Sequence, residues 1–237
     1  MEYFTSENYY ELSNLVASVM IDEIKANPKA NICLASGSSP KLSYEIFTKR
    51  VLKENIDIKD VFFTKLDEWC GFEKNYEATC EKYLRDLILN PLGVNENKYI
   101  SFKPDSNDYE REVETVKQKL QENPITLSVL GLGKNGHLGL NEPSNFLYPF
   151  AHISSLAEVT KMHDMVKDVE VSSGMTIGMN EILNSRKIIL IVSGLNKQQV
   201  FDRFLLREID TDLPATFLWL HQNVKVLIQS DQFTFKI

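Results

Sequence analysis

Residues 30–40 read Ala-Asn-Ile-Cys-Leu-Ala-Ser-Gly-Ser-Ser-Pro and predict a buried strand that ends in a turn of small residues. The first six residues are almost entirely apolar, which is typical of a strand covered by helices on both faces. Residues 42–52 then carry apolar side chains at helical spacing. A strand, a turn and a helix in this order form the first part of a βαβ unit, so this stretch indicates an α/β fold.

The same alternation continues on both sides of this segment. We expect further strands at 61–66, 125–130, 187–192 and 224–228, and further helices at 6–27, 79–89, 109–121 and 196–206. This order predicts a Rossmann-like, doubly wound, mostly parallel sheet with helices on both faces. Because no Pro/Gly/Ser-rich linker and no internal repeat divides the chain, we expect a single domain over residues 1–237.

Composition excludes several classes of protein. The formal net charge of −7 argues against a nucleic-acid binder, which would need a dense basic face. No apolar run approaches the roughly 18 residues of a membrane span, and the first residues do not resemble a signal peptide. The three cysteines Cys33, Cys70 and Cys80 form no CxxC pair, so we expect neither disulfides nor a zinc site. Reduced thiols and a cytoplasmic location are the simplest expectation.

Two strand-to-helix junctions carry residues suited to binding an anion. Ser36, Gly37, Ser38 and Ser39 combine hydroxyl groups with a backbone that a ligand can approach closely, just before a helix N-terminus. Lys197 lies at the expected start of another helix, where the helix dipole disfavours a cation unless an anion is bound nearby. A plain capped turn and a solvated lysine are the alternatives, but the two features together favour an anion site at the carboxyl ends of the strands.

Acid–base groups occur at two further strand ends. Asp67 directly follows the expected strand 61–66, and a partly desolvated carboxylate there is a candidate base, although a surface turn or helix cap is also compatible. His137 lies in a glycine-rich stretch, residues 131–143, with Asn135 and Glu142 on either side of it. Both neighbours could orient the imidazole ring. The spacing His-x4-Glu alone does not indicate a metal, so we expect none.

Taken in order, residues 34–40, 66–69, 131–143 and 193–197 resemble the glucosamine-6-phosphate deaminase/6-phosphogluconolactonase superfamily. Residues 133–143 and 214–221 are similar to the galactosamine-6-phosphate isomerase (deaminase) branch. The resemblance implies a cofactor-independent enzyme whose partner is a small sugar phosphate. It implies neither nucleic acid nor membrane as a partner, and it leaves a homo-oligomer open.

The resemblance also implies roles for individual residues. Ser36, Gly37, Ser38, Ser39 and Lys197 would bind the phosphate. Asp67 would move a proton between C2 and C1, and His137, supported by Glu142, would open the sugar ring. The expected reaction converts galactosamine 6-phosphate to tagatose 6-phosphate and ammonia.

The chain departs from the superfamily pattern in two places. The glucosamine enzymes have an aspartate where this chain has Asn135, so His137 is expected to depend on Glu142 alone for a compensating charge. The arginine that clamps the phosphate from the lid has no clear match, although Lys161 and His163 lie in the corresponding region.

Three other functions fit parts of this pattern. A glucosamine-6-phosphate deaminase would use the same chemistry and yield fructose 6-phosphate and ammonia. A 6-phosphogluconolactonase would lack the carboxylate of Glu142. A non-catalytic sugar-phosphate sensor would explain Asn135 but not the joint presence of Asp67, His137 and Glu142.

Overall fold

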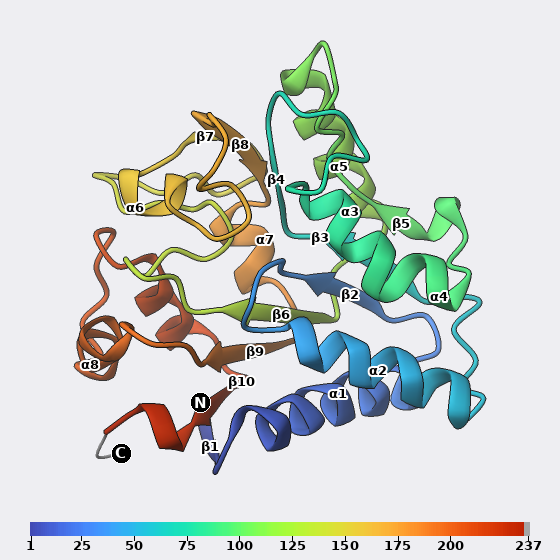
Figure 1. Cartoon of the computed structure of the whole chain (residues 1–237), viewed down its shortest axis with the longest axis horizontal. Helices are drawn as coiled ribbons and strands as arrows, with labels where there is room; N and C mark the ends of the chain where they lie inside the picture. The colour runs from blue at the N-terminus through green and yellow to red at the C-terminus, as the bar shows by residue number, and fades with distance from the viewer. Residues whose placement is uncertain (235–237) are drawn as a thin grey trace.

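The computed structural model describes residues 1–234 and places seven strands in one parallel sheet (Figure 1). The strand order is β1-β10-β9-β6-β2-β3-β5, and each neighbouring pair runs parallel. The strands are β1 (Glu2–Ser6), β2 (Asn31–Leu34), β3 (Phe62–Lys65), β5 (Tyr99–Ile100), β6 (Leu127–Gly131), β9 (Lys187–Val192) and β10 (Val224–Gln229). The mostly parallel α/β sheet predicted from the sequence is thus confirmed.

Helices cover both faces of this sheet. On one face lie α1 (Tyr9–Ala26) and α2 (Lys41–Lys53), and on the other lie α5 (Tyr109–Glu122), α7 (Met179–Leu183) and α8 (Gln198–Leu205). Alternate residues of a strand pack into different cores: Ile32 belongs to the core under α1 and α2, whereas Cys33 belongs to the core under α5, α7 and α8. Each fully buried aliphatic side chain contributes roughly 1.5–3 kcal/mol, which explains why the apolar strands identify the sheet.

The first helix begins later than the sequence predicted. Residue Ser6 was expected to start it, but Glu2–Ser6 forms β1 beside β10, and Asn8 caps α1 by accepting a hydrogen bond from the backbone N–H of Glu11. The expected helix 79–89 is divided into α3 (Cys80–Leu84) and a π-helical turn (Arg85–Leu89), followed by α4 (Asn90–Leu92). Short 3-10 turns lie at Glu96–Lys98, Pro214–Leu220 and Ser230–Gln232.

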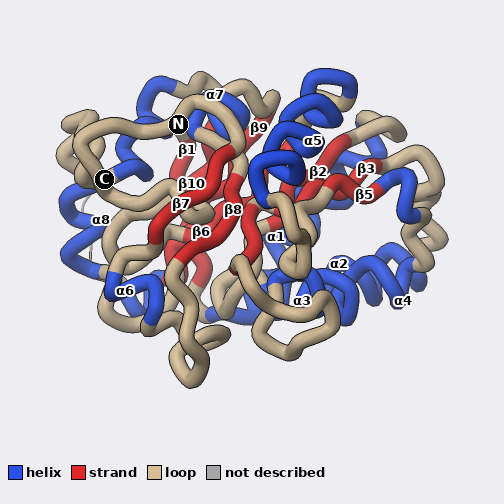
Figure 2. Tube along the Cα trace, turned by 90° about the horizontal axis from the view of Figure 1, so that it is seen from above, coloured by secondary structure: helices blue, strands red, loops and turns tan. Residues whose placement is uncertain are grey.

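A second, antiparallel sheet that the sequence did not predict lies at the carboxyl edge of the first (Figure 2). It contains β4 (Asp67–Trp69), β8 (Ser173–Thr176) and β7 (His152–Ser155), with the short helix α6 (Glu158–Lys161) in the connection between β7 and β8. Only Leu66 separates β3 from β4, and Asp67 pairs with Thr176 of β8. Asp67 therefore stands where the chain passes from one sheet to the other.

No helix within residues 1–234 has the length and apolar character needed to cross a membrane.

Candidate active site

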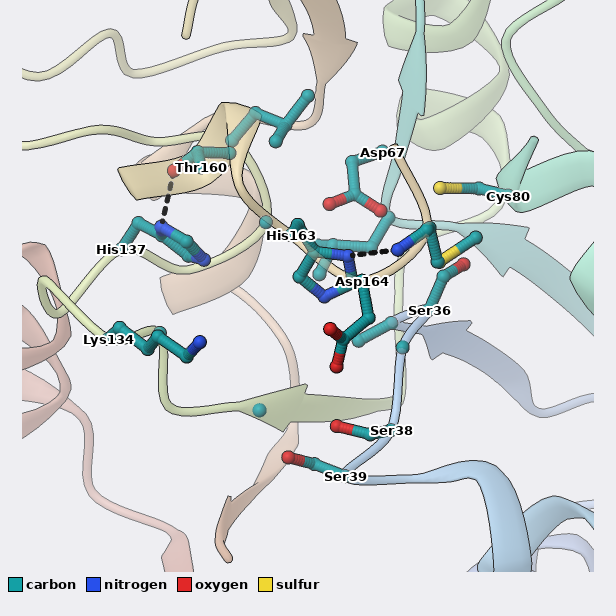
Figure 3. A pocket seen from close by; sticks show the side chains of 18 of the residues that line it. Ser36, Ser38, Ser39, Asp67, Cys80, Lys134, His137, Thr160, His163 and Asp164 are labelled. Carbon is teal, nitrogen blue, oxygen red and sulfur yellow. Dashed lines mark hydrogen bonds between the residues drawn. The ribbon is translucent and has the colours of Figure 1, made fainter. Parts of the chain in front are cut away.

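A pocket opens at the carboxyl ends of β2, β3, β6 and β9, and its walls contain most of the residues singled out in the sequence (Figure 3). These are Ser36, Gly37, Ser38, Ser39, Asp67, His137 and Lys197. Asn135 and Glu142 do not line the pocket and lie behind His137. Four segments far apart in the sequence therefore meet at one place, as the parallel strand order requires.

One end of the pocket is cationic. Lys197 lies at the N-terminal boundary of α8, and its Nζ atom donates a hydrogen bond to Ser39 Oγ over 3.3 Å. Burial, together with the charge of Lys134, lowers the pKa of Lys197 to about 8. No carboxylate among residues 1–234 forms an ion pair with either lysine. A bound anion would offset the unfavourable burial of this ammonium group.

The loop after β2 is held in one conformation by tyrosines from two helices. The hydroxyl of Tyr83 donates to the carbonyl of Gly37 over 2.7 Å, and that of Tyr9 donates to the carbonyl of Ser38 over 2.6 Å. Gly37 itself has φ of +112°, a backbone region that side chains disfavour. A Cβ atom at this position would also lie 3.2 Å from Nε2 of His163. The positive φ therefore favours glycine at this position, and a larger residue would also crowd the His163 ring.

Asp67 occupies the floor of the pocket. Its Oδ1 atom is buried, and no hydrogen-bond partner for it is found in the described part of the chain. Burial, and then the neighbouring carboxylate of Glu68, raise the pKa of Asp67 from 3.8 to about 7, against an opposing effect of Lys65. A carboxylate with a pKa near neutrality can accept and return a proton at physiological pH.

His137 faces Asp67 from another wall of the pocket. Its Nδ1 atom lies 3.3 Å from Thr160 Oγ1 and 3.5 Å from Glu142 Oε2, while its other ring nitrogen is directed toward the pocket in Figure 3. The ring packs so closely on Gly133 that a Cβ atom there would lie 2.5 Å from Nε2. The glycine, the hydroxyl and the carboxylate together fix the orientation of the imidazole.

Asn135 acts through Glu142. Its side-chain amide donates to Glu142 Oε2 over 2.9 Å, and its Oδ1 accepts the backbone N–H of His137 over 3.2 Å. No hydrogen bond joins Asn135 to the ring itself, so the expectation that both neighbours orient the ring holds directly only for Glu142. Although burial acts to raise it, the pKa of Glu142 lies below its ordinary value because of His137, Thr160 and Asn135. Glu142 is therefore a buried anion 3.5 Å from the imidazole ring.

Three further residues of the pocket had no role assigned from the sequence, although His163 was noted as lying in the lid region. Lys134 points its ammonium group into the pocket, and Thr160 and His163 reach it from the segment around α6 (Figure 3). Burial, followed by the charge of His137, lowers the pKa of His163 to about 4. Of the two residues expected near the lid, His163 lines the pocket, whereas Lys161 forms a 2.7 Å ion pair with Glu158.

Within residues 1–234, no group of three or more His, Cys, Asp and Glu side chains is arranged to hold a metal ion. The pocket is lined by the carboxyl groups of Asp67 and Asp164, the imidazoles of His137 and His163, and the ammonium groups of Lys134 and Lys197.

Comparison with known proteins identifies the relatives of this chain. Residues 5–228 match the family of glucosamine-6-phosphate isomerases/6-phosphogluconolactonase. The deaminase-family protein AgaI of Escherichia coli (strain K12) is 41% identical over 94% of this chain and 90% of its own length. Glucosamine-6-phosphate deaminase of Clostridium perfringens (strain 13 / Type A) is 29% identical, with 98% of each chain covered.

Solved structures agree with this result. A monomeric glucosamine-6-phosphate deaminase superposes with a TM-score of 0.91 at 28% identity, covering 96% of this chain and 97% of its own. The 6-phosphogluconolactonase from Plasmodium vivax, at 15% identity and a TM-score of 0.79 over 99% of this chain and 91% of its own, shares the fold. The chain belongs to the glucosamine-6-phosphate isomerase/6-phosphogluconolactonase family.

Proposed function

We propose that this protein is a hexosamine-6-phosphate isomerase/deaminase that converts galactosamine 6-phosphate and water to tagatose 6-phosphate and ammonia. The observation that carries the proposal is the arrangement of Asp67 and His137 on different walls of a pocket with a cationic end. The names of AgaI as a deaminase and of two further relatives as glucosamine-6-phosphate deaminases support the class of reaction.

The two acid–base groups divide the proton transfers between them. His137, oriented through Nδ1 by Thr160 and Glu142, transfers a proton to the ring oxygen and opens the sugar ring. Asp67 then removes the proton on C2, and an enolamine forms. Return of that proton to C1 gives an imine at C2, to which water adds, and ammonia leaves. Each positioned proton transfer contributes about 10²- to 10⁴-fold to the rate.

The phosphate of the substrate would bind at the cationic end of the pocket. Lys197 supplies a desolvated ammonium group, and Ser36, Ser38 and Ser39 supply hydroxyl groups beside a glycine turn. Binding at a site remote from C1 and C2 orients the reacting carbons, which reduces the entropic part of the barrier.

The second candidate is a glucosamine-6-phosphate deaminase, which would yield fructose 6-phosphate and ammonia. The two sugars differ only in the orientation of the C4 hydroxyl, so the same acid–base groups serve both. The galacto sugar is proposed first because residues 133–143 and 214–221 resemble the galactosamine-6-phosphate isomerase (deaminase) branch.

Two other activities are less compatible with the site. A lactonase hydrolyses an ester and has no need of the buried Glu142 carboxylate behind the histidine. A sensor that only binds sugar phosphates would gain nothing from a buried Asp67 with its pKa near 7, because an unpaired buried carboxyl group costs stability.

The test is ammonia release from the purified protein, supplied separately with galactosamine 6-phosphate and glucosamine 6-phosphate. Faster release from the galacto sugar supports the proposal, and faster release from the gluco sugar keeps the mechanism but reverses the substrate. Absence of ammonia from both would overturn the deaminase proposal. Hydrolysis of 6-phosphogluconolactone, measured in parallel, would then establish the lactonase alternative.

A further inference from the structure

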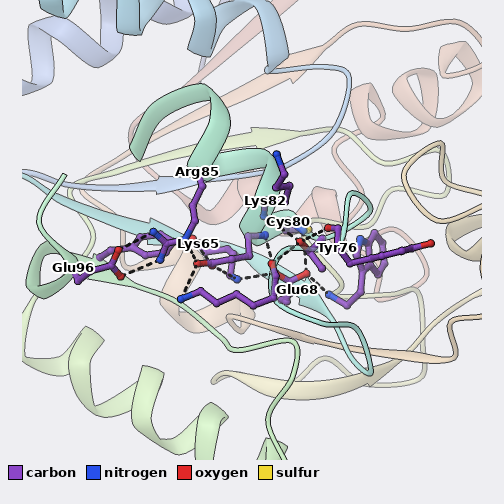
Figure 4. A network of polar contacts seen from close by, with 12 residues as sticks. Lys65, Glu68, Tyr76, Cys80, Lys82, Arg85 and Glu96 are labelled. Carbon is purple, nitrogen blue, oxygen red and sulfur yellow. Dashed lines mark hydrogen bonds and ion pairs between the residues drawn. The ribbon is translucent and has the colours of Figure 1, made fainter. Parts of the chain in front are cut away.

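A network of charged side chains lies next to the pocket and has no role in the proposed chemistry (Figure 4). Its centre is Lys65, which is completely buried and forms ion pairs of 2.7 Å with Glu68 and 2.8 Å with Glu81. Arg85 joins the network to the surface by pairing with Glu81 at 2.6 Å and with Glu96 at 2.7 Å. Figure 4 follows this chain of contacts from the interior to the exposed Glu96.

The carboxylate of Glu68 accepts hydrogen bonds from one side chain and three backbone N–H groups. Besides Lys65, it accepts backbone N–H groups of Trp69 at 2.9 Å, Cys80 at 3.0 Å and Glu81 at 2.8 Å. These bonds tie the N-terminus of α3 to β4. Cys80, the first residue of that helix, lines the pocket beside Asp67. Glu68 therefore holds together the two elements that form the pocket floor.

Stability alone does not account for such a network. The cost of removing two charges from water offsets most of the attraction within a buried ion pair. Well-packed apolar residues at the same positions are often as stabilising as the ion pair. Lys65 and Glu68 also lie close to Asp67 in the sequence. Lys65 precedes it by two residues, and Glu68 follows it directly. Each places a full charge close to the proposed base, and the two charges have opposite signs.

We propose that Lys65 and Glu68 are positioning residues for Asp67, which fix its place at the junction of the two sheets and balance opposite charges around its carboxyl group. This inference rests on the proposed role of Asp67 as the proton-transfer base. In physical terms, the anion of Glu68 favours the protonated form of Asp67 and the cation of Lys65 favours the ionised form.

Other groups also face Asp67 and must remain constant in a test. Cys33 of β2, Tyr44 of α2 and Cys80 of α3 all experience its charge, and His137, His163 and Asp164 line the same pocket. Glu68→Gln and Lys65→Met change none of these side chains, and Gln keeps an oxygen that can accept the backbone N–H groups of Cys80 and Glu81. A change in the titration midpoint of Asp67 then reports the loss of the charge on Lys65 or Glu68.

The experiment is a titration of the Asp67 carboxyl carbon by ¹³C NMR, assigned by loss of its signal in Asp67→Asn. We expect Glu68→Gln to shift the midpoint to lower pH and Lys65→Met to shift it to higher pH, each by roughly one pH unit. The matched control is Glu96→Gln, which removes a carboxylate from the exposed end of the same network and is expected to leave the midpoint unchanged. Shifts in the same direction for the two buried variants, or no shift in either, would overturn the proposal.

A double variant guards against misfolding. If Lys65→Met does not fold, Lys65→Met combined with Glu81→Gln removes one charge of each sign and leaves Glu68 in place, so the upward shift is still expected. If the midpoint does not shift upward in this double variant, the proposal is wrong.

The NMR titration does not require turnover, so its result can be interpreted even if the protein releases no ammonia. If the protein is active, the acidic limb of kcat/KM must move in the same directions.

Discussion

The ammonium group of Lys197 and the hydroxyl group of Ser39 lie 3.3 Å apart and join the loops that follow β9 and β2. These residues are 158 positions apart in the sequence, yet they form one end of a single pocket. Because Lys197 is buried beside a second cation, Lys134, its charge is poorly compensated in the free protein. An anion at this position would therefore bind with unusually favourable electrostatics.

Replacing Lys197 by methionine should raise KM for the sugar phosphate by about 10- to 100-fold, since a hydrogen bond to a charged group contributes about 1.5–3 kcal/mol. The maximal rate should fall much less, because the reacting carbons are remote from this residue. Steady-state kinetics of Lys197→Met measure both effects. The matched control is Lys119→Met on the exposed face of α5. Equal kinetics in the two variants would remove Lys197 from the phosphate site.

The pH dependence of kcat/KM should be a narrow bell. Asp67 must be ionised to accept a proton, so the rate rises as pH increases through its pKa of about 7. Lys197 must be charged to bind phosphate, so the rate falls as pH increases through its pKa of about 8. In Lys197→Met the alkaline limb should disappear while the acidic limb stays. A profile that is flat between pH 6 and about 9 would contradict both assignments.

Replacing Asp67 by asparagine should abolish ammonia release while leaving phosphate binding intact, because the amide cannot accept the C2 proton. The same change should raise stability at alkaline pH. The folded-state pKa of Asp67 lies above its unfolded value, so its stabilising contribution is present below about pH 4 and is lost as pH rises through about 7. The difference corresponds to at most about 4 kcal/mol. Thermal unfolding of both proteins at pH 4 and pH 8 measures it, and an equal gain at both values would count against a buried, titrating Asp67.

Glutamine in place of Glu142 should lower kcat by about 10²-fold, since it retains the shape but not the charge that compensates a protonated His137. KM should change little, because Glu142 does not line the pocket. Glu158→Gln, an exposed change in α6, provides the control. A variant with unchanged kcat would show that His137 needs no anionic partner.

Alanine at Gly37 should raise KM, whereas alanine at Gly71 should not. Both glycines have positive φ, +112° and +92°, so both substitutions strain the backbone by roughly 1–2 kcal/mol. At Gly37 the new methyl group would also press on His163, while at Gly71 nothing lies within 4 Å of it. Comparing KM and unfolding midpoints of the two variants separates the clash in the pocket from general strain. Similar kinetics in both would argue against a functional contact between Gly37 and His163.

The sequence predicted the apolar part of the fold well, because fully buried strands such as β6 and β9 must be continuously hydrophobic. It failed where polar residues form strands. Glu2–Ser6 is an edge strand of five residues with three polar side chains and no apolar alternation, and Ser173–Thr176 belongs to a small sheet whose partners come from other segments. Neither carries a local pattern strong enough to identify it.

In the site, too, residues with a local sequence signal were predicted and residues placed by tertiary packing were not. Ser36–Ser39, Asp67, His137 and Lys197 were predicted because each follows a strand end, and parallel strands bring such ends together. Thr160 and His163 come from the connection between β7 and β8, whose position depends on tertiary packing alone. Lys65 has no pattern that distinguishes it from a surface lysine, although it is completely buried.

Because only Leu66 separates β3 from β4, Asp67 is held by both sheets, and this affects how the enzyme could diverge. Asp67 is part of the framework itself, since its backbone pairs with Thr176 and its neighbours belong to two sheets. Thr160 and His163 instead belong to the connection between β7 and β8, which contributes no strand to the parallel sheet. Substitutions in this connection can therefore reshape one wall of the pocket while the backbone pairing that positions Asp67 is kept.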